Sequence, residues 1–295
     1  MSRAASPPQQ EPDGAATNRS ILVATAGSGD YLFAAGGTLA AFIREGHPVY
    51  VAQFGNDEKL SSGLIPAATR LANVEEAAGA AKLLGVRDTV YLGHKSGELG
   101  HVSSTEMRQQ LFALIRHFKP RVLFIPDPYV HYQDDADRYW TGKMAEEAWG
   151  YSGGAKFANE LARMGLAPHA APEVYYYASA RPYRPGEGGN GRARWLARDI
   201  AQTMAVKLEA TGLLLTRNRV FAHHALERLR AAGRPARFLE PLTDAAALGL
   251  ARAWVEELAE TIGAKHGWRY AEEFNYVGPS DEAPPHALER AVGKR

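Results

Sequence analysis

The chain has 295 residues, no cysteine, and 34 Lys and Arg residues against 33 Asp and Glu residues. The lack of cysteine excludes disulfides, thiolate nucleophiles and cysteine metal sites, and the balanced charge gives no broad field for nucleic acid or an anionic membrane. No run approaches the roughly 20 apolar residues of a membrane helix. We therefore expect a cytoplasmic protein with one domain over 20–277, a disordered tail at 1–19 and a C-terminal tail at 278–295.

The segment 21–39 predicts a strand, a tight turn and a helix. Ile21-Leu-Val23 is a short apolar run, and Gly27-Ser-Gly29 follows it as a turn. Residues 32–44 then carry apolar side chains at helical spacing. In open α/β sheets such a turn lies at the carboxyl end of a strand, where ligands bind.

Further along the chain, strands and helices continue to alternate. We expect a strand at 49–54, a helix at 67–84 ending before Gly85, a strand at 121–126, and a helix from about 135 to 149. This alternation predicts an α/β fold with a Rossmann-like, mostly parallel sheet flanked by helices.

The turn and the helix after it resemble the first motif of the PIG-L/LmbE family of zinc-dependent de-N-acetylases. That motif reads His-Pro-Asp-Asp-Glu just before Gly-Gly-Thr-Leu, and here Ala35 precedes Gly36-Gly-Thr-Leu39. Without a gap, its five positions are occupied by Gly27, Ser28, Gly29, Asp30 and Tyr31. The resemblance assigns the first and fourth positions to the metal and the third to the base that deprotonates a metal-bound water. Glycine can do neither, so only Asp30 is retained, and we expect Tyr31 to fill the volume vacated by metal and water.

The family's second motif, His-Pro-Asp-His followed by Arg-x-x-Gly, is similar to residues 135–142. Aligned on Gly142, the ligand histidine becomes Arg138, the assisting histidine becomes Asp135, and Asp137 is retained. Arginine stays protonated and has no lone pair to give a metal. Our hypothesis is that Arg138 stands where zinc would be and pairs with Asp30, so that the pocket is rebuilt.

The resemblance extends over about 20–277 and implies an LmbE-like fold. The segments that follow the family's order are Tyr91–Leu99, Glu173–Tyr177, Lys207–Ala210 and Tyr270–Phe274. Ser96 stands where the family has a substrate-contacting aspartate. Residues 184–194, rich in glycine and proline, predict a mobile surface loop near the pocket. The basic segment 217–243 receives no role from the sequence.

Several other residues have both a functional and a purely structural interpretation. His94, at a strand end, is a candidate to bind a ligand hydroxyl or act as a general base, or is a loop histidine bonded to backbone. Asp135 and Asp137 are acid/base candidates for metal-free catalysis. His131 with Asp30 and Asp137 has the ligand types of a new metal site, whereas the same acidic loop can simply cap the following helix.

Three functional interpretations follow from the substituted motifs. The first is a binding or regulatory protein without a cofactor, taking a small carbohydrate-like ligand in a pocket formed by Gly27, Gly29, Asp30, Tyr31, His94 and Arg138. The second is an enzyme that reuses this pocket without metal, and the third is an N-acetyl-sugar deacetylase with zinc on a different ligand set. A homo-oligomer is compatible with all three.

A competing class is an enzyme that binds a nucleotide or methyl donor. Gly27-Ser-Gly29 after a strand is a partial Gly-x-Gly fingerprint. Leu32 occupies the position of the third glycine, and only Asp57 or Glu58 approximates the later acidic residue.

Overall fold

The computed structural model describes residues 19–130, 135–157, 159–178 and 194–278, in which strands and helices alternate as expected. The strands are β1 Ile21–Thr25, β2 Val49–Gly55, β3 Asp88–His94, β4 Val122–Pro126, β5 Glu173–Tyr177, β6 Arg194–Asp199 and β7 Ala271–Val277. The helices are α1 Asp30–Arg44, α2 Pro66–Leu84, α3 Ser104–Phe118, α4 Ala136–Ser152, α5 Asn159–Arg163, α6 Met204–Gly212, α7 Leu215–Ala231 and α8 Asp244–His266, with short 3-10 turns η1 Leu99–His101 and η2 Arg237–Leu239.

The strands form one sheet in the order β3-β2-β1-β4-β5-β7-β6. Neighbours from β3 to β5 pair in parallel, and β7 runs antiparallel to both β5 and β6. The mostly parallel α/β fold predicted from the sequence is therefore confirmed. Because β1 lies between β2 and β4, the chain reverses its direction of sheet growth there, and the carboxyl ends of β1 and β4 flank a topological switch point.

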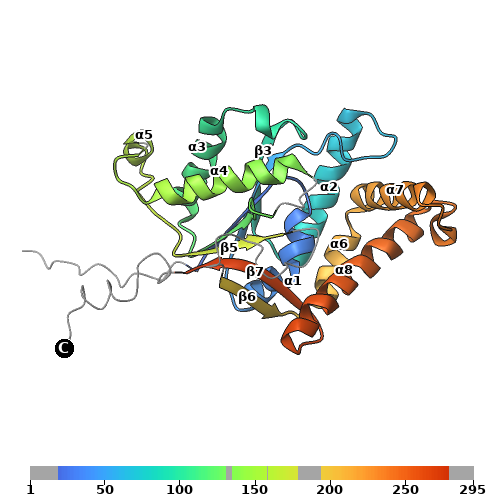
Figure 1. Ribbon diagram of the computed structural model, residues 1–295. Helices are drawn as coiled ribbons and strands as arrows, with labels where there is room; N and C mark the ends of the chain where they lie inside the picture. Colours follow the sequence, from blue (N-terminus) through green and yellow to red (C-terminus); the bar gives the residue numbers. More distant parts are fainter. Residues whose placement is uncertain (1–18, 131–134, 158, 179–193, 279–295) are drawn as a thin grey trace, which may run out of the picture.

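The two faces of the sheet are covered by different helices. Ile21 and Val23 of β1 point into the core shared with α1, α2, α6 and α8, whereas Leu22 and Ala24 point into the core shared with α3 and α4. This alternation is the period-two pattern of a strand buried on both sides. Figure 1 shows α3 and α4 together on one side of the sheet, and α6 and α8 beside each other away from them.

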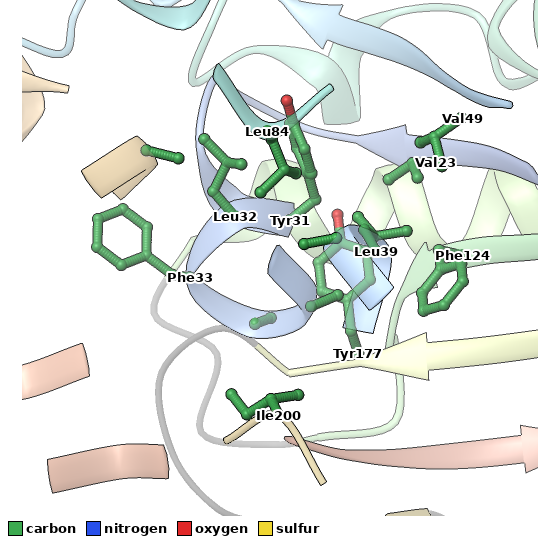
Figure 2. Close-up of a cluster of buried hydrophobic side chains, with 14 of the residues drawn as sticks. Val23, Tyr31, Leu32, Phe33, Leu39, Val49, Leu84, Phe124, Tyr177 and Ile200 are labelled. Carbon is green, nitrogen blue, oxygen red and sulfur yellow. The ribbon is translucent and has the colours of Figure 1, made fainter. Parts of the chain in front are cut away.

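Helix α1 packs deeply because its two consecutive glycines allow close approach. A Cβ on Gly37 would lie 2.8 Å from Ile200, so no side chain fits there. The backbone N–H groups of Gly37 and Thr38 donate to the Glu272 carboxylate at 2.9 and 2.7 Å. Lys207 of α6 pairs with the same carboxylate at 2.7 Å, and both side chains are 2% exposed. Figure 2 shows the apolar cluster that surrounds α1.

The ends of the helices follow ordinary capping chemistry. Gly85 ends α2 with a φ of 96°, as its sequence position predicts. Asp135 caps α4 by accepting a hydrogen bond from the Asp137 N–H. The segment 217–243, which has no sequence-assigned role, forms most of α7, then η2, and packs through α7 on α8. Within the described residues, no helix combines the length and apolarity required to traverse a lipid bilayer.

Candidate functional site

A cavity of about 230 Å³ lies at the carboxyl ends of the central strands. Its lining includes Gly27 and Asp30 from the turn after β1, and Asp57 from the loop after β2. Arg138, from the first turn of α4, and Arg217, from the first turn of α7, complete its charged wall. The position agrees with the switch-point rule for open α/β sheets, so this cavity is the candidate site.

Asp30 is the buried centre of this wall. Its Oδ1 accepts a hydrogen bond from Arg138 Nε at 3.1 Å, and Arg138 Nη2 lies 3.0 Å from the same oxygen. Arg217 Nη2 also donates to Oδ1, and the Gly27 N–H donates to Oδ2 at 3.2 Å. Burial is the largest influence on the pKa of Asp30 and favours the neutral acid. The two guanidinium groups together outweigh burial and hold the pKa below its ordinary value.

Arg217 comes from the segment to which the sequence assigned no role. Its guanidinium also donates to the Ser28 carbonyl and lies 5.5 Å from the Phe33 ring centroid. The start of α7 is held by Glu76 of α2, whose carboxylate accepts from the Thr216 N–H and hydroxyl at 2.8 Å each. Arg217 and Asp30 are 187 positions apart, so no local sequence pattern links them.

Asp57 is fixed by contacts on its backbone and on one carboxylate oxygen. Its N–H donates to Ser96 Oγ at 2.7 Å, and its carbonyl accepts from Asn73 Nδ2 at 3.1 Å. Its Oδ2 accepts from the Ser28 N–H at 2.7 Å and from Gln53 Nε2 at 2.9 Å. Its φ of 55° is in the left-handed region, which aspartate tolerates better than most residues. Burial raises the pKa of the Asp57 carboxyl, against the opposing effects of Ser28 and Arg217.

The two acids of α4 organise the surrounding loops. Asp137 accepts hydrogen bonds from the Gly97 and Leu99 N–H groups and so holds the loop after β3 against α4. Asp135 caps α4, and its Oδ2 lies 3.8 Å from Arg138 Nε. Burial raises the pKa of Asp135, although the neighbouring Arg138 acts in the opposite direction. Both carboxylates line the cavity.

The remaining predicted pocket residues lie elsewhere. His94 Nε2 is 2.7 Å from Gln110 Oε1 of α3, and its ring stacks on Phe54 at 6.4 Å. Tyr31 is 3% exposed in the apolar cluster around α1, and burial raises the pKa of its hydroxyl. Neither of these residues is among those lining the cavity, and the predicted pocket residue Gly29 is not among them either. His131 and most of the loop 184–194 lie outside the described residues.

The turn of the partial Gly-x-Gly fingerprint is already engaged with carboxylates. The Gly27 and Ser28 N–H groups donate to Asp30 and Asp57, respectively. These are the groups that a dinucleotide-binding turn presents to phosphate. The arrangement therefore gives the nucleotide-binding class no support.

Comparison with known proteins shows which proteins this chain is similar to. Residues 22–149 match the family described as PIG-L: GlcNAc-PI de-N-acetylase. Over these residues the chain is PIG-L/LmbE-like. A diacetylchitobiose deacetylase of Thermococcus kodakarensis is 28% identical over 140 residues, which are 48% of this chain and 47% of that protein. The match thus spans about half the length of this relative.

Solved structures with the same fold cover most of the chain. The N,N'-diacetylchitobiose deacetylase from Pyrococcus horikoshii has a TM-score of 0.69 at 21% identity, over 92% of this chain and 88% of that one. GalB, a 4-carboxy-2-hydroxymuconate hydratase from Pseudomonas putida, has a TM-score of 0.63 at 20% identity, over 88% and 96%. The conserved protein TT1542 from Thermus thermophilus has a TM-score of 0.62 at 19% identity, over 90% and 96%. These likenesses establish the fold.

Within this PIG-L/LmbE-like chain, the two glycines of the first motif are sites of close contact. A Cβ on Gly27 would lie 2.6 Å from Asp57 Oδ1. A Cβ on Gly29 would lie 2.3 Å from Leu214 Cδ1, and the φ of Gly29 is +85°. The Asp57 carboxylate and the start of α7 therefore fill the space that side chains at these positions would need.

The donor set around Asp30 does not suit the zinc that the family resemblance implies. Zinc takes lone pairs from His, Asp, Glu or Cys, whereas the two groups held on Asp30 are guanidinium cations. Over residues 19–130, 135–157, 159–178 and 194–278, no three His, Asp or Glu side chains gather as a metal-binding group. The ion pair hypothesised between Arg138 and Asp30 is present.

Proposed function

We propose that this PIG-L/LmbE-like protein binds a small carbohydrate-like ligand without a metal and does not act as a zinc hydrolase. The observation that carries the proposal is the convergence of Arg138 and Arg217 on the single buried carboxylate of Asp30. Both guanidinium groups are permanently charged. The aspartate retained from the family's metal site therefore has cations of the chain itself as its partners.

The chemistry of metal-assisted hydrolysis supports this proposal. That reaction needs a metal with an open position for water and a group that removes the water's proton. Gly27 and Gly29 occupy the positions that the resemblance gives to a ligand and to this base, and neighbouring side chains fill their space. The fold alone does not decide the reaction, since a fold can host unrelated chemistries.

The lining of the cavity favours a polar ligand. Arg138, Arg217 and Lys59 supply N–H donors, and the carboxylate of Asp135 supplies acceptors. Its volume of about 230 Å³ is below the roughly 300–1,000 Å³ of pockets for drug-sized ligands, which limits the buried part of the ligand to a small group. A sugar ring with hydroxyls or an N-acyl group has this size and polarity. The relatives named for acting on diacetylchitobiose are consistent with this class.

The decisive experiment measures metal and activity on the same purified sample. The protein is supplemented with zinc, desalted and analysed for metal, and then assayed for acetate release from N,N'-diacetylchitobiose with and without a chelator. We expect substoichiometric zinc, no chelator-sensitive acetate release, and saturable binding of the sugar by calorimetry. The Thermococcus relative serves as the positive control for deacetylation.

Two variants identify where any bound zinc lies. Asp30→Asn removes the retained carboxylate, whereas a double His223→Ala and His224→Ala variant removes the exposed histidine pair on α7. Zinc that disappears only with the histidine pair is adventitious. Stoichiometric zinc that disappears with Asp30→Asn, together with zinc-dependent acetate release, would overturn the proposal in favour of a deacetylase with a rebuilt site.

A further inference from the structure

Asp57, one of the residues that line the cavity, carries an unusual buried polar atom. Its residue is 1% exposed, and its Oδ1 has no hydrogen-bond partner among the described residues. Its other oxygen, Oδ2, accepts from both the Ser28 N–H and Gln53 Nε2. Buried carboxyl oxygens rarely stay unpaired, because the loss of hydration is uncompensated. The imbalance between the two oxygens therefore needs a chemical explanation.

A proton on Oδ1 accounts for this imbalance. Oδ2, with two N–H donors, is in the position of the carbonyl oxygen of a neutral acid, while Oδ1 has no hydrogen bond among the described residues, although the nearby Ser28 hydroxyl favours the ionised carboxylate. The groups around the carboxyl are Asp30 from α1, Tyr91 from β3, Arg217 from α7 and Lys59 from its own loop. Burial, with a smaller contribution from the Asp30 charge, raises the pKa of Asp57 despite the opposing effects of Ser28 and Arg217, and this direction favours the protonated form.

We propose that Asp57 is the specificity-determining residue of the cavity, where its protonated Oδ1 donates a hydrogen bond to an acceptor oxygen of the ligand, such as an acyl carbonyl. The inference rests on the proposed function, because it assigns the recognition of an N-acyl sugar to that same cavity. Asp57 is suited to this role because its backbone and Oδ2 are held by Ser96, Asn73, Ser28 and Gln53. The direction in which Oδ1 donates is thereby set before the ligand arrives.

The same geometry explains why position 27 is glycine. Oδ1 lies 2.6 Å from the point that a Cβ on Gly27 would occupy, so any side chain there would displace the carboxyl group. The site that the family resemblance gives to a metal-binding histidine is here the space of a hydrogen-bond donor. The metal-binding role that the resemblance gives to position 27 is thus replaced by ligand recognition at Asp57, which lies 30 positions further along the chain.

The first test uses two substitutions with opposite expectations. In Asp57→Asn, the amide oxygen can take both N–H donors and leave the NH₂ group directed into the cavity, which preserves donation. Asp57→Leu removes the hydrogen-bond donor. We expect the dissociation constant for N-acetylglucosamine to stay within about threefold in Asp57→Asn and to rise about 5- to 100-fold in Asp57→Leu. Glucosamine, which lacks the acyl carbonyl, should bind wild-type protein more weakly than N-acetylglucosamine.

A matched control addresses the other unpaired polar atom at this site. Ser28 Oγ is also buried without a hydrogen-bond partner among the described residues. Ser28→Ala should leave N-acetylglucosamine binding within about threefold, because its backbone N–H still holds Asp57 Oδ2. A loss in Ser28→Ala equal to that in Asp57→Leu would transfer the role to the serine and overturn the proposal.

A second measurement does not depend on any ligand. The ¹³C resonance of the Asp57 carboxyl carbon, identified by its absence in Asp57→Asn, reports its protonation directly. We expect the Asp57 carboxyl of wild-type protein to be protonated at neutral pH. Circular dichroism checks that the variants retain the native fold. An ionised Asp57 at neutral pH, or equal loss of binding in Asp57→Asn and Asp57→Leu, would overturn the inference. If wild-type protein binds no sugar, the proposed function fails as well; if it binds sugar with equal affinity in all variants, only the role of Asp57 fails.

Discussion

Two buried carboxylates in this protein illustrate opposite uses of the same chemistry. Glu272 lies on the sheet side of α1, where one lysine and two backbone N–H groups satisfy it and both charged side chains are 2% exposed. Asp30 is the first residue of the same helix, where two arginines, each 14% exposed, share it at the wall of a cavity. The pair of Lys207 and Glu272 is buried and stabilises the packing of α1. At Asp30, two cations face one carboxylate at the wall of a cavity that a ligand can enter.

The largest expected effect comes from removing the single cation of the buried pair. Lys207→Met leaves Glu272 buried without its charged partner and should lower the free energy of unfolding by about 3–5 kcal/mol. Urea unfolding measures this loss. Lys207→Met combined with Glu272→Gln should recover much of it, because no buried charge is then left unpaired. A single variant as stable as wild type would contradict the structural role of the pair.

Removing one cation from the shared carboxylate should cost less. Arg217→Met leaves Arg138 on Asp30 and should lower the free energy of unfolding by about 1.5–3 kcal/mol. Arg219→Met is the matched control, since Arg219 lies on the same helix and pairs with the exposed Asp244; a loss below about 1 kcal/mol is expected there. Equal effects of the two substitutions in urea unfolding would show that Arg217 is not part of the buried wall.

Two glycines with nearly equal backbone angles test whether the turn beside the cavity has room for a side chain. Gly29 and Gly46 have φ values of +85° and +86°, but a Cβ on Gly46 meets nothing within 4 Å. Gly29→Ala should therefore be less stable than Gly46→Ala by about 1–3 kcal/mol, the typical cost of overpacking. Thermal unfolding of the two variants gives the difference directly. If both variants lose the same stability, Leu214 moves aside and the packing around Gly29 is more adaptable than its contacts indicate.

The two cavity carboxyls should give pH dependences of opposite sign. The pKa of Asp30 is lowered in the fold, so its contribution to stability is present above about pH 3.9 and is lost as the pH falls further. The pKa of Asp57 is raised, so its contribution is complete below about pH 3.9 and is lost as the pH rises through the raised value.

This contrast predicts that Asp57→Asn gains stability relative to wild type as the pH increases. The gain should be about 1.4 kcal/mol for each pH unit between the unfolded and folded pKa values, because asparagine does not titrate. Urea unfolding from pH 4 to pH 8 measures it. A pH-independent difference between the two proteins would show that the carboxyl titrates normally.

Much of the fold was predictable because its signals are local. The apolar run before Gly27, the helical spacing after it and the Gly85 cap each arise from residues close in sequence, and all appear where expected. The pair between Arg138 and Asp30 was also predictable, since the family resemblance places both at one site.

The rest of the candidate site depends on contacts that no local pattern encodes. Arg217 reaches Asp30 only because Glu76 fixes the start of α7, and this contact joins residues 140 positions apart. In sequence, Asp57 only approximates the later acidic residue of a Gly-x-Gly fingerprint, because its burial and its unpaired oxygen exist only in the folded chain. Conversely, His94 has a suitable residue type at a suitable strand end, but its ring is bonded to Gln110.

The origin of the cations on Asp30 has a consequence for the life of the protein in a cell. A metal ion must be acquired after synthesis, competes with other ions and can be withdrawn by a chelator. The guanidinium groups of Arg138 and Arg217 are made with the chain and stay charged throughout the physiological pH range. The positive charge facing Asp30 is therefore complete when folding ends, and nutrient shortage or metal stress cannot remove it.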